Sequence, residues 1–163
     1  MQNNLNDARA TIEAALGYDV PDNNHNASAL HGIIALRQGE EVAARGAFVR
    51  AIGQADEILS KTAEYYSALD AKGLAICGLL ICDLRLKKGD GRGAVSAPDG
   101  VAKTGREDLA PTVDDAIETF RKARKIAPHA GIVKSVLRLF DELAKCDKKG
   151  ILKEVRGAVE GKE

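Results

Sequence analysis

The residue types that most often carry out chemistry are sparse in this sequence. Its three histidines, His25, His31 and His129, match neither the HExxH zinc motif nor a nucleophile–base pattern. We expect His31, at a core-facing helix position, to be a partly buried imidazole with its hydrogen bonds satisfied. His25 lies in the loop PDNNHN and His129 begins a helix, so both are expected to be exposed to solvent. The histidines therefore predict no catalytic site.

A glycine-rich stretch, KKGDGRGAVSAPDGVAKTGRED, resembles phosphate-binding loops, in which successive backbone N–H groups bind anions. Lys103 and Thr104 are adjacent, as in the GK[ST] ending of such loops. However, Ala102 stands where that ending needs glycine, and no apolar strand precedes the stretch. Asp90 and Asp99 lack the spacing of a calcium-binding loop. We interpret the stretch as a flexible, solvated loop.

The three cysteines are expected to be core residues. Cys77, Cys82 and Cys146 form no CxxC motif and lie near no histidine at zinc-ligand spacing. Cys77 and Cys82 are five residues apart on one expected helix, so their side chains point in different directions and cannot form a disulfide. We expect reduced, buried thiols. The sequence thus predicts no metal site, no cofactor and no enzyme.

Length and composition narrow the class of protein. The 163 residues suit one domain with its own core. No apolar run approaches the roughly 20 residues that a membrane-spanning helix needs. Lys and Arg number 24, Asp and Glu number 24, and aromatic residues make up 4%, so we expect neither a nucleic acid nor a membrane partner. The segment MQNNLNDARA lacks the features of a secretory signal, and a cytoplasmic location is expected.

The charges are unevenly divided along the chain. Residues 1–83 contain six Lys/Arg and eleven Asp/Glu, which leaves a net charge of −5, whereas residues 84–163 contain eighteen and thirteen, which leaves +5. Such an asymmetry can steer an encounter or favour head-to-tail contacts. A chance division of the charged residues on solvent-exposed helix faces gives the same asymmetry.

Apolar residues recur at spacings of three and four almost throughout, which is the period of a helix, and no alternating stretch is long enough for a strand. The fold class is therefore all-α. Gly17, Gly39 and Pro128 end helices, and Thr112 with Asp115 forms a pattern like a capping box. The expected helices, about seven in number, span residues 4–16, 27–38, 40–60, 63–87, 112–126, 130–145 and 149–159.

The helices form pairs with a repeated pattern. In the segment LHGIIALRQGEEVAARGAFVRAI the pattern consists of small residues and one phenylalanine: Gly32, Ala35, Gly39, Ala44, Phe48 and Ala51. We expect Gly32 to let two helices approach closely and Phe48 to fill the gap between successive pairs. This pattern resembles the tetratricopeptide repeat family, although His31 stands where that family usually has Leu.

The same pattern continues on both sides of this pair. A second set of matching positions is split between two helices: Leu74, Cys77, Gly78 and Ile81, then Ala116, Phe120, Ala123 and Pro128. The expected organisation is an antiparallel helix-pair solenoid, with a half repeat at 1–21, a repeat at 26–60, a repeat at 63–128 interrupted by a glycine-rich loop at 88–111, and capping helices at 129–163. A chain that begins within a repeat suggests a module of a larger protein.

The resemblance implies a right-handed superhelix whose first helices line a concave groove. The groove-facing positions are Asn26, Ala29, Ile33, Leu36, Arg37, Lys72, Ala75, Leu79, Cys82 and Asp83. Family members that clamp acidic C-terminal peptides use a basic residue and an Asn at the places held here by Ala29 and Ile33, so that type of binding is not expected. The remaining apolar positions, Ala29, Ile33, Leu36, Ala75 and Leu79, would form an apolar strip.

Three explanations for this strip remain open. It receives a helix or apolar peptide from a partner protein, it is filled by the insertion or the terminal cap, or it is covered by missing repeats or a second copy. The sequence favours a scaffold or sensor module that binds a protein partner without catalysis. The alternatives are a homo-oligomer that assembles through its array ends and, less favoured, a small helical enzyme with the glycine-rich insertion as a lid.

Overall fold

The computed structural model describes residues 2–18, 20–89 and 110–162, and these residues form seven α-helices and no strand. The all-α class is therefore confirmed. The helices are α1 (Gln2–Leu16), α2 (Asn24–Gln38), α3 (Glu41–Lys61), α4 (Tyr66–Gly89), α5 (Val113–Ile126), α6 (Ala130–Ala144) and α7 (Lys153–Glu160). Most of the glycine-rich loop expected at 88–111 lies outside the described residues. None of the described helices combines the length and hydropathy needed to cross a bilayer.

Local interactions explain where several helices begin and end. α2 ends at Gly39, whose φ of 81° is a left-handed conformation that favours glycine. α5 begins with the expected capping box, in which the Thr112 hydroxyl accepts from the Asp115 N–H and the Asp115 carboxylate accepts from the Thr112 N–H. α7 begins later than expected because the Asp147 carboxylate accepts three backbone N–H groups, from residues 149, 150 and 152, and holds that segment as a turn.

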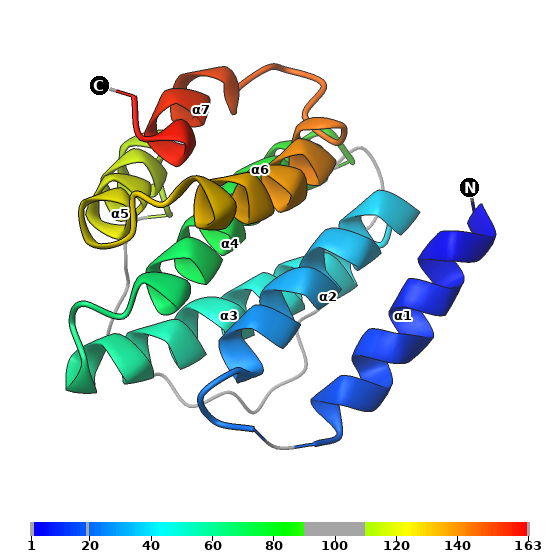
Figure 1. The fold of residues 1–163 in the computed structure, drawn as a ribbon. Coiled ribbons are helices and arrows are strands. Elements are labelled where there is room, and N and C mark those ends of the chain that lie inside the picture. Colours follow the sequence, from blue (N-terminus) through cyan, green and yellow to red (C-terminus); the bar gives the residue numbers. More distant parts are fainter. Residues whose placement is uncertain (1, 19, 90–109, 163) are drawn as a thin grey trace.

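Consecutive helices pack side by side from α1 to α5, and α2 also packs against α4 (Figure 1). α6 does not extend this series. It lies across α2 and α4, while α7 packs against α5. α6, which follows the pair α4 and α5, therefore turns back over α2 and α4, the first helices of the two pairs.

Two phenylalanines fit into gaps that glycines leave in facing helices. Phe48 of α3 lies between α2 and α4, and a Cβ atom added at Gly32 would come within 2.5 Å of its ring, with Gly78 closer still. Phe120 of α5 lies against Gly73 in the same way, at 2.7 Å. Both rings are fully buried. The prediction that Gly32 allows close approach and that Phe48 fills the gap between pairs is thus confirmed.

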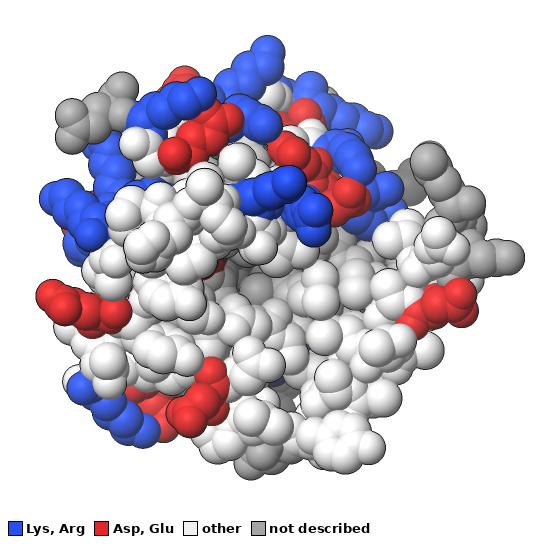
Figure 2. All heavy atoms as spheres, viewed as in Figure 1, with Lys and Arg blue, Asp and Glu red and all other residues white. Residues whose placement is uncertain are grey.

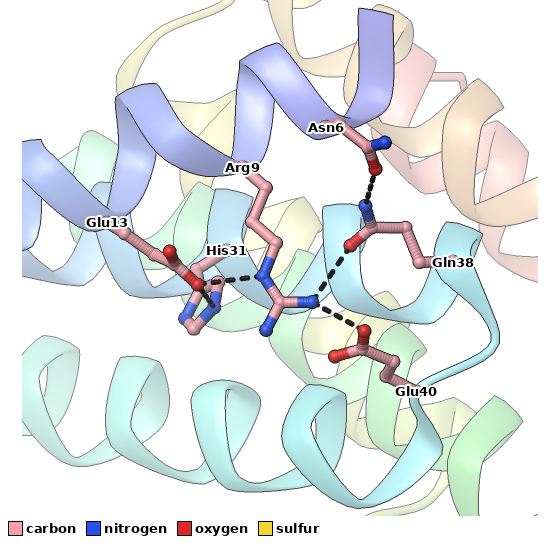
Figure 3. Close-up of polar contacts among 6 residues, drawn as sticks. All are labelled: Asn6, Arg9, Glu13, His31, Gln38 and Glu40. Carbon is pink, nitrogen blue, oxygen red and sulfur yellow. Dashed lines mark hydrogen bonds and ion pairs between the residues drawn. The ribbon is translucent and has the colours of Figure 1, made fainter. Parts of the chain in front are cut away.

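α1 is attached through a narrow, largely polar contact. Ile12 is its one buried side chain among those the structure describes. Arg9 donates to Glu13 within α1, to Gln38 at the end of α2 and to Glu40 just before α3, and Gln38 donates to Asn6 (Figure 3). These contacts hold α1 along one side of α2.

His31 lies under this contact without the hydrogen bonds expected for it. Its side chain is 13% exposed, and the Glu13 carboxylate is 4.0 Å from Nε2, too far for a hydrogen bond (Figure 3). Neither ring nitrogen has a hydrogen-bond partner among the described residues. Burial, helped by Arg50 and Arg9, lowers the pKa of His31 and so favours the neutral ring.

Candidate functional site

The apolar strip expected to line a groove is buried. Its five residues, Ala29, Ile33, Leu36, Ala75 and Leu79, are between 0% and 5% exposed. They share a core cluster with three residues of α6: Val136, Phe140 and Leu143. The expected open groove is therefore absent at these positions, because the apolar face of α6 covers them. Of the three explanations, the structure shows a covering by the chain's own 129–163 segment.

The other predicted groove residues are buried, form ion pairs or lie at a hollow. Cys82 is fully buried, and burial raises its pKa to about 12. Arg37 forms an ion pair with Glu142 of α6, which helps to hold α6 over α2. Lys72 pairs with Asp56 at 2.5 Å and Asp83 with Arg45 at 3.1 Å, both between α3 and α4. Asn26 borders an open hollow.

This hollow, which we call the α4–α6 hollow, lies where the amino-terminal parts of α2, α4 and α6 meet. It has a volume of about 400 Å³ and opens to solvent. Figure 2 shows that the surface around the centre of this face is hollowed and carries few charged side chains. The lining residues come from the amino-terminal parts of α2, α4 and α6: Asn26, Tyr66, Ser67, Asp70, Ala71, Leu74, Gly131, Ile132, Ser135, Val136 and Leu139.

A buried ion pair lies at the base of this hollow. Asp70 of α4 and Arg124 of α5 are 5% and 6% exposed, and the Arg124 Nη2 group donates to the Asp70 carboxylate. Burial raises the pKa of Asp70, while the Arg124 charge and hydrogen bond oppose that rise. The two residues are 54 positions apart in sequence, so no motif or helical spacing connects them. Sequence reasoning missed this pair.

Polar side chains line the α2 side of the hollow. The Asn26 side-chain N–H groups donate to the Asn23 Oδ1 atom and to the Ser67 hydroxyl, both at 2.9 Å, and the His25 Nε2 atom lies 3.3 Å from the same hydroxyl. His25 is fully buried, so the expectation that it is solvent-exposed was wrong. α2 begins three residues earlier than expected and places the His25 ring edge-on against Tyr65.

The side chains of His25 and Ser67 have the composition of a base and a nucleophile. No described residue hydrogen-bonds to the other ring nitrogen, Nδ1, so no third group orients the imidazole. Burial also lowers the pKa of His25. We interpret these side chains as hydrogen-bonding groups at the edge of the hollow.

The opposite wall of the hollow is apolar. Leu74 of α4 and Ile132, Val136 and Leu139 of α6 form it. A polar rim facing an apolar wall suits a ligand with hydrogen-bonding groups on one side and an apolar group on the other. Peptide segments that carry an apolar side chain have this character.

No group of His, Cys, Asp and Glu side chains in the described part of the chain is arranged to hold a metal ion. The three cysteines are buried and unpaired, as expected. His129 is exposed, also as expected.

Comparisons with known proteins identify no relative of this chain. No family model matches it, and neither a curated protein nor a solved structure does.

Proposed function

We propose that this protein is a tetratricopeptide-like interaction module that binds a segment of a partner protein in the α4–α6 hollow and catalyses no reaction itself. The observation that carries the proposal is the lining of this hollow, with hydrogen-bonding groups on α2 and α4 facing an apolar wall on α6.

Support for a repeat architecture comes from the glycine–phenylalanine contacts. Phe48 contacts Gly32 on the helix before it and Gly78 on the helix after it, and Phe120 contacts Gly73 on the helix before it. In a helix-pair array, one large ring per pair fills the space where three helices meet. The two first helices, α2 and α4, also lie in contact. α6 then occupies part of the concave side and leaves only its open end for a ligand.

The shape and polarity of the hollow favour a short peptide segment. The Asn26 Oδ1 atom can accept from a peptide N–H group, and the Tyr66 hydroxyl can donate or accept. Leu74, Ile132 and Leu139 can receive one apolar side chain, since a volume of about 400 Å³ exceeds that of any single side chain. Binding by one apolar anchor and a few hydrogen bonds is typical of peptide recognition in grooves.

The proposal is tested by selecting peptides from a displayed random library on the wild-type protein and measuring their affinities by fluorescence polarisation. Ser135→Trp fills the hollow from an exposed position on α6 that lines it. Lys134→Trp is the matched control, since Lys134 is the exposed neighbour on the same helix and does not line the hollow. We expect Ser135→Trp to weaken binding at least tenfold, by about 1.4 kcal/mol, and Lys134→Trp to leave it unchanged. Equal effects of the two substitutions contradict the proposal.

Self-assembly through the array ends is the second candidate function. It is favoured by two exposed apolar side chains beside α1, Tyr18 at 73% and Val20 at 50%. Light scattering at several concentrations separates the two candidates. A monomeric interaction module keeps a mass of 17.3 kDa throughout, whereas self-assembly gives a mass that rises with concentration and falls again in a Tyr18→Ser, Val20→Ser variant.

A further inference from the structure

A second hollow, separate from the α4–α6 hollow, lies between α5 and the carboxyl end of α7 and has a volume of about 380 Å³. Its lining consists of four cationic and two small residues: Arg121, Arg124, Lys125, Lys162, Ala158 and Gly161. No acidic side chain is among these lining residues. We call this site the α5–α7 hollow.

Two of its cations have no internal counter-ion. Arg121 and Lys125 are exposed on α5, four residues apart, and neither forms an ion pair with another described residue. Like charges at this spacing destabilise a helix by a few tenths of a kcal/mol. Lys125 lies in the last turn of α5, where the helix dipole favours a cation, but Arg121 precedes that turn. The dipole therefore does not account for both residues.

Arg124 adds a buried cation beside this hollow. Its Nη2 group donates to Asp70, while Nε and Nη1 are buried and have no partner among the described residues. Asp70 lines the α4–α6 hollow and Arg124 lines the α5–α7 hollow, so the positive end of the ion pair lies toward α7. Asp70 balances the charge of Arg124, but the Nε and Nη1 groups remain N–H donors without an acceptor, which an anion in the adjoining hollow can supply.

The turn after α7 places the fourth cation. Gly161 has a φ of 74°, and a Cβ atom added there would lie 3.5 Å from the Arg124 Cγ atom, so this turn lies directly over the stem of Arg124. The Lys162 N–H donates to the Gly157 carbonyl, which ends the helix at this point. Lys162 also pairs with Glu160 at 2.7 Å and so contributes less free charge than Arg121 and Lys125.

We propose that the α5–α7 hollow binds a phosphate group, carried either by a small molecule or by a phosphorylated side chain. Phosphate bears close to two negative charges and three acceptor oxygens, which matches several converging cations better than a single carboxylate does. The arginine fork suits phosphate oxygens. The small volume and the zero net charge of the chain argue against a long polyanion such as a nucleic acid.

The test is a titration of the full-length protein with inorganic phosphate, followed by NMR chemical shifts, against sodium chloride of equal ionic strength. The test variant is Arg121→Gln, Lys125→Gln. The matched control is Lys134→Gln, Arg138→Gln, because these residues are also exposed, four apart on one helix, and without an ion pair to a described residue, yet they line neither hollow.

We expect saturable shifts around residues 121–125 and 158–162 with phosphate but not with chloride. The affinity falls at least fivefold in the test variant and changes less than twofold in the control. Equal weakening in both variants, or shifts that chloride reproduces, overturns the proposal, since either result indicates general attraction of anions. Circular dichroism melting of each variant confirms that it remains folded.

The source of the phosphate is distinguished by two further ligands. Pyrophosphate that binds more tightly than phosphate indicates a small molecule, whereas a phosphoserine peptide that binds more tightly indicates a protein partner. The same peptide without its phosphate is expected not to bind. If it binds equally well, the phosphate assignment is wrong.

Discussion

Phe48 fills space that two glycines leave free, so the size of the residue at a glycine position decides how closely the helices pack. Gly78→Ala is expected to destabilise the fold by about 1–3 kcal/mol, because the added methyl group overlaps a fully buried ring. Phe48→Ala removes the ring and is expected to cost about 3–5 kcal/mol through the cavity left behind. Urea denaturation of each variant measures both losses.

Gly53→Ala serves as the control for this prediction. Gly53 lies within α3 with no atom within 4 Å of an added Cβ, so alanine there is expected to stabilise the fold by about 0.5–1 kcal/mol. A gain of similar size for Gly78→Ala, or a loss below about 1 kcal/mol for Phe48→Ala, contradicts the close packing between pairs.

His25 is expected to make stability depend on pH. Burial lowers its pKa below the ordinary value of 6.5, against an opposing effect of Asp22. The unfolded chain therefore binds a proton at a higher pH than the folded chain does, and the free energy of unfolding decreases as pH falls from 6.5 through the lowered pKa. Urea denaturation between about pH 7 and pH 5 is expected to show this decrease.

Two histidine variants identify which residue causes this decrease in the free energy of unfolding. His25→Gln is expected to flatten the decrease, leaving the part due to His31, whose pKa is also lowered. His129→Gln, at an exposed position, is expected to leave the decrease unchanged. If His25→Gln shows the wild-type pH dependence, the imidazole is not held neutral by burial.

At the scale of elements, the capping box at the start of α5 predicts a second pH effect of the same sign. Hydrogen bonds from the Thr112 hydroxyl and N–H lower the pKa of Asp115 below its ordinary value of 3.8. The cap thus stabilises α5 above pH 3.8 and is lost as pH falls through the lowered pKa. Asp115→Ala is expected to cost about 0.5 kcal/mol near neutral pH, a small value because the carboxylate is exposed.

The pH dependence of that cost separates the cap from other roles of Asp115. We expect the denaturation midpoints of wild type and Asp115→Ala to converge as pH falls below the lowered pKa of Asp115, where the carboxylate is protonated in both states. A difference that persists there is unrelated to the charge on Asp115.

At the scale of the whole molecule, α6 decides whether the apolar strip is core or surface. A chain that ends at Pro128 is expected to expose Ile33, Leu36 and Leu79, bind a hydrophobic dye and aggregate, because surfaces of this kind do not remain free in water. Light scattering measures the aggregation and dye fluorescence measures the exposed apolar surface, with the full-length protein as the control. A shortened chain that stays monomeric and melts cooperatively shows instead that the strip is a free groove.

Much of the helical structure is predictable from the sequence because its causes are local. Apolar residues at spacings of three and four define a buried face, Gly39 and Pro128 end helices, and Thr112 with Asp115 begins one. Each of these signals acts within about one helical turn. The contact between Gly32 and Phe48 was also predictable, because a short connection forces α2 and α3 to lie antiparallel.

The candidate site was not predictable, because contacts between distant segments create it. The pattern of Val136, Phe140 and Leu143 shows that one face of α6 is buried but not which helices it packs against. Asp70 and Arg124 are 54 residues apart, and the burial of His25 depends on Tyr65 and Ser67 of another segment. The sequence by itself thus determined the helices and their pairing, through interactions within a turn or across a short connection. Only the tertiary structure decided that α6 covers the apolar strip and leaves the α4–α6 hollow open, because that choice depends on how the surfaces of α2, α4 and α6 fit together.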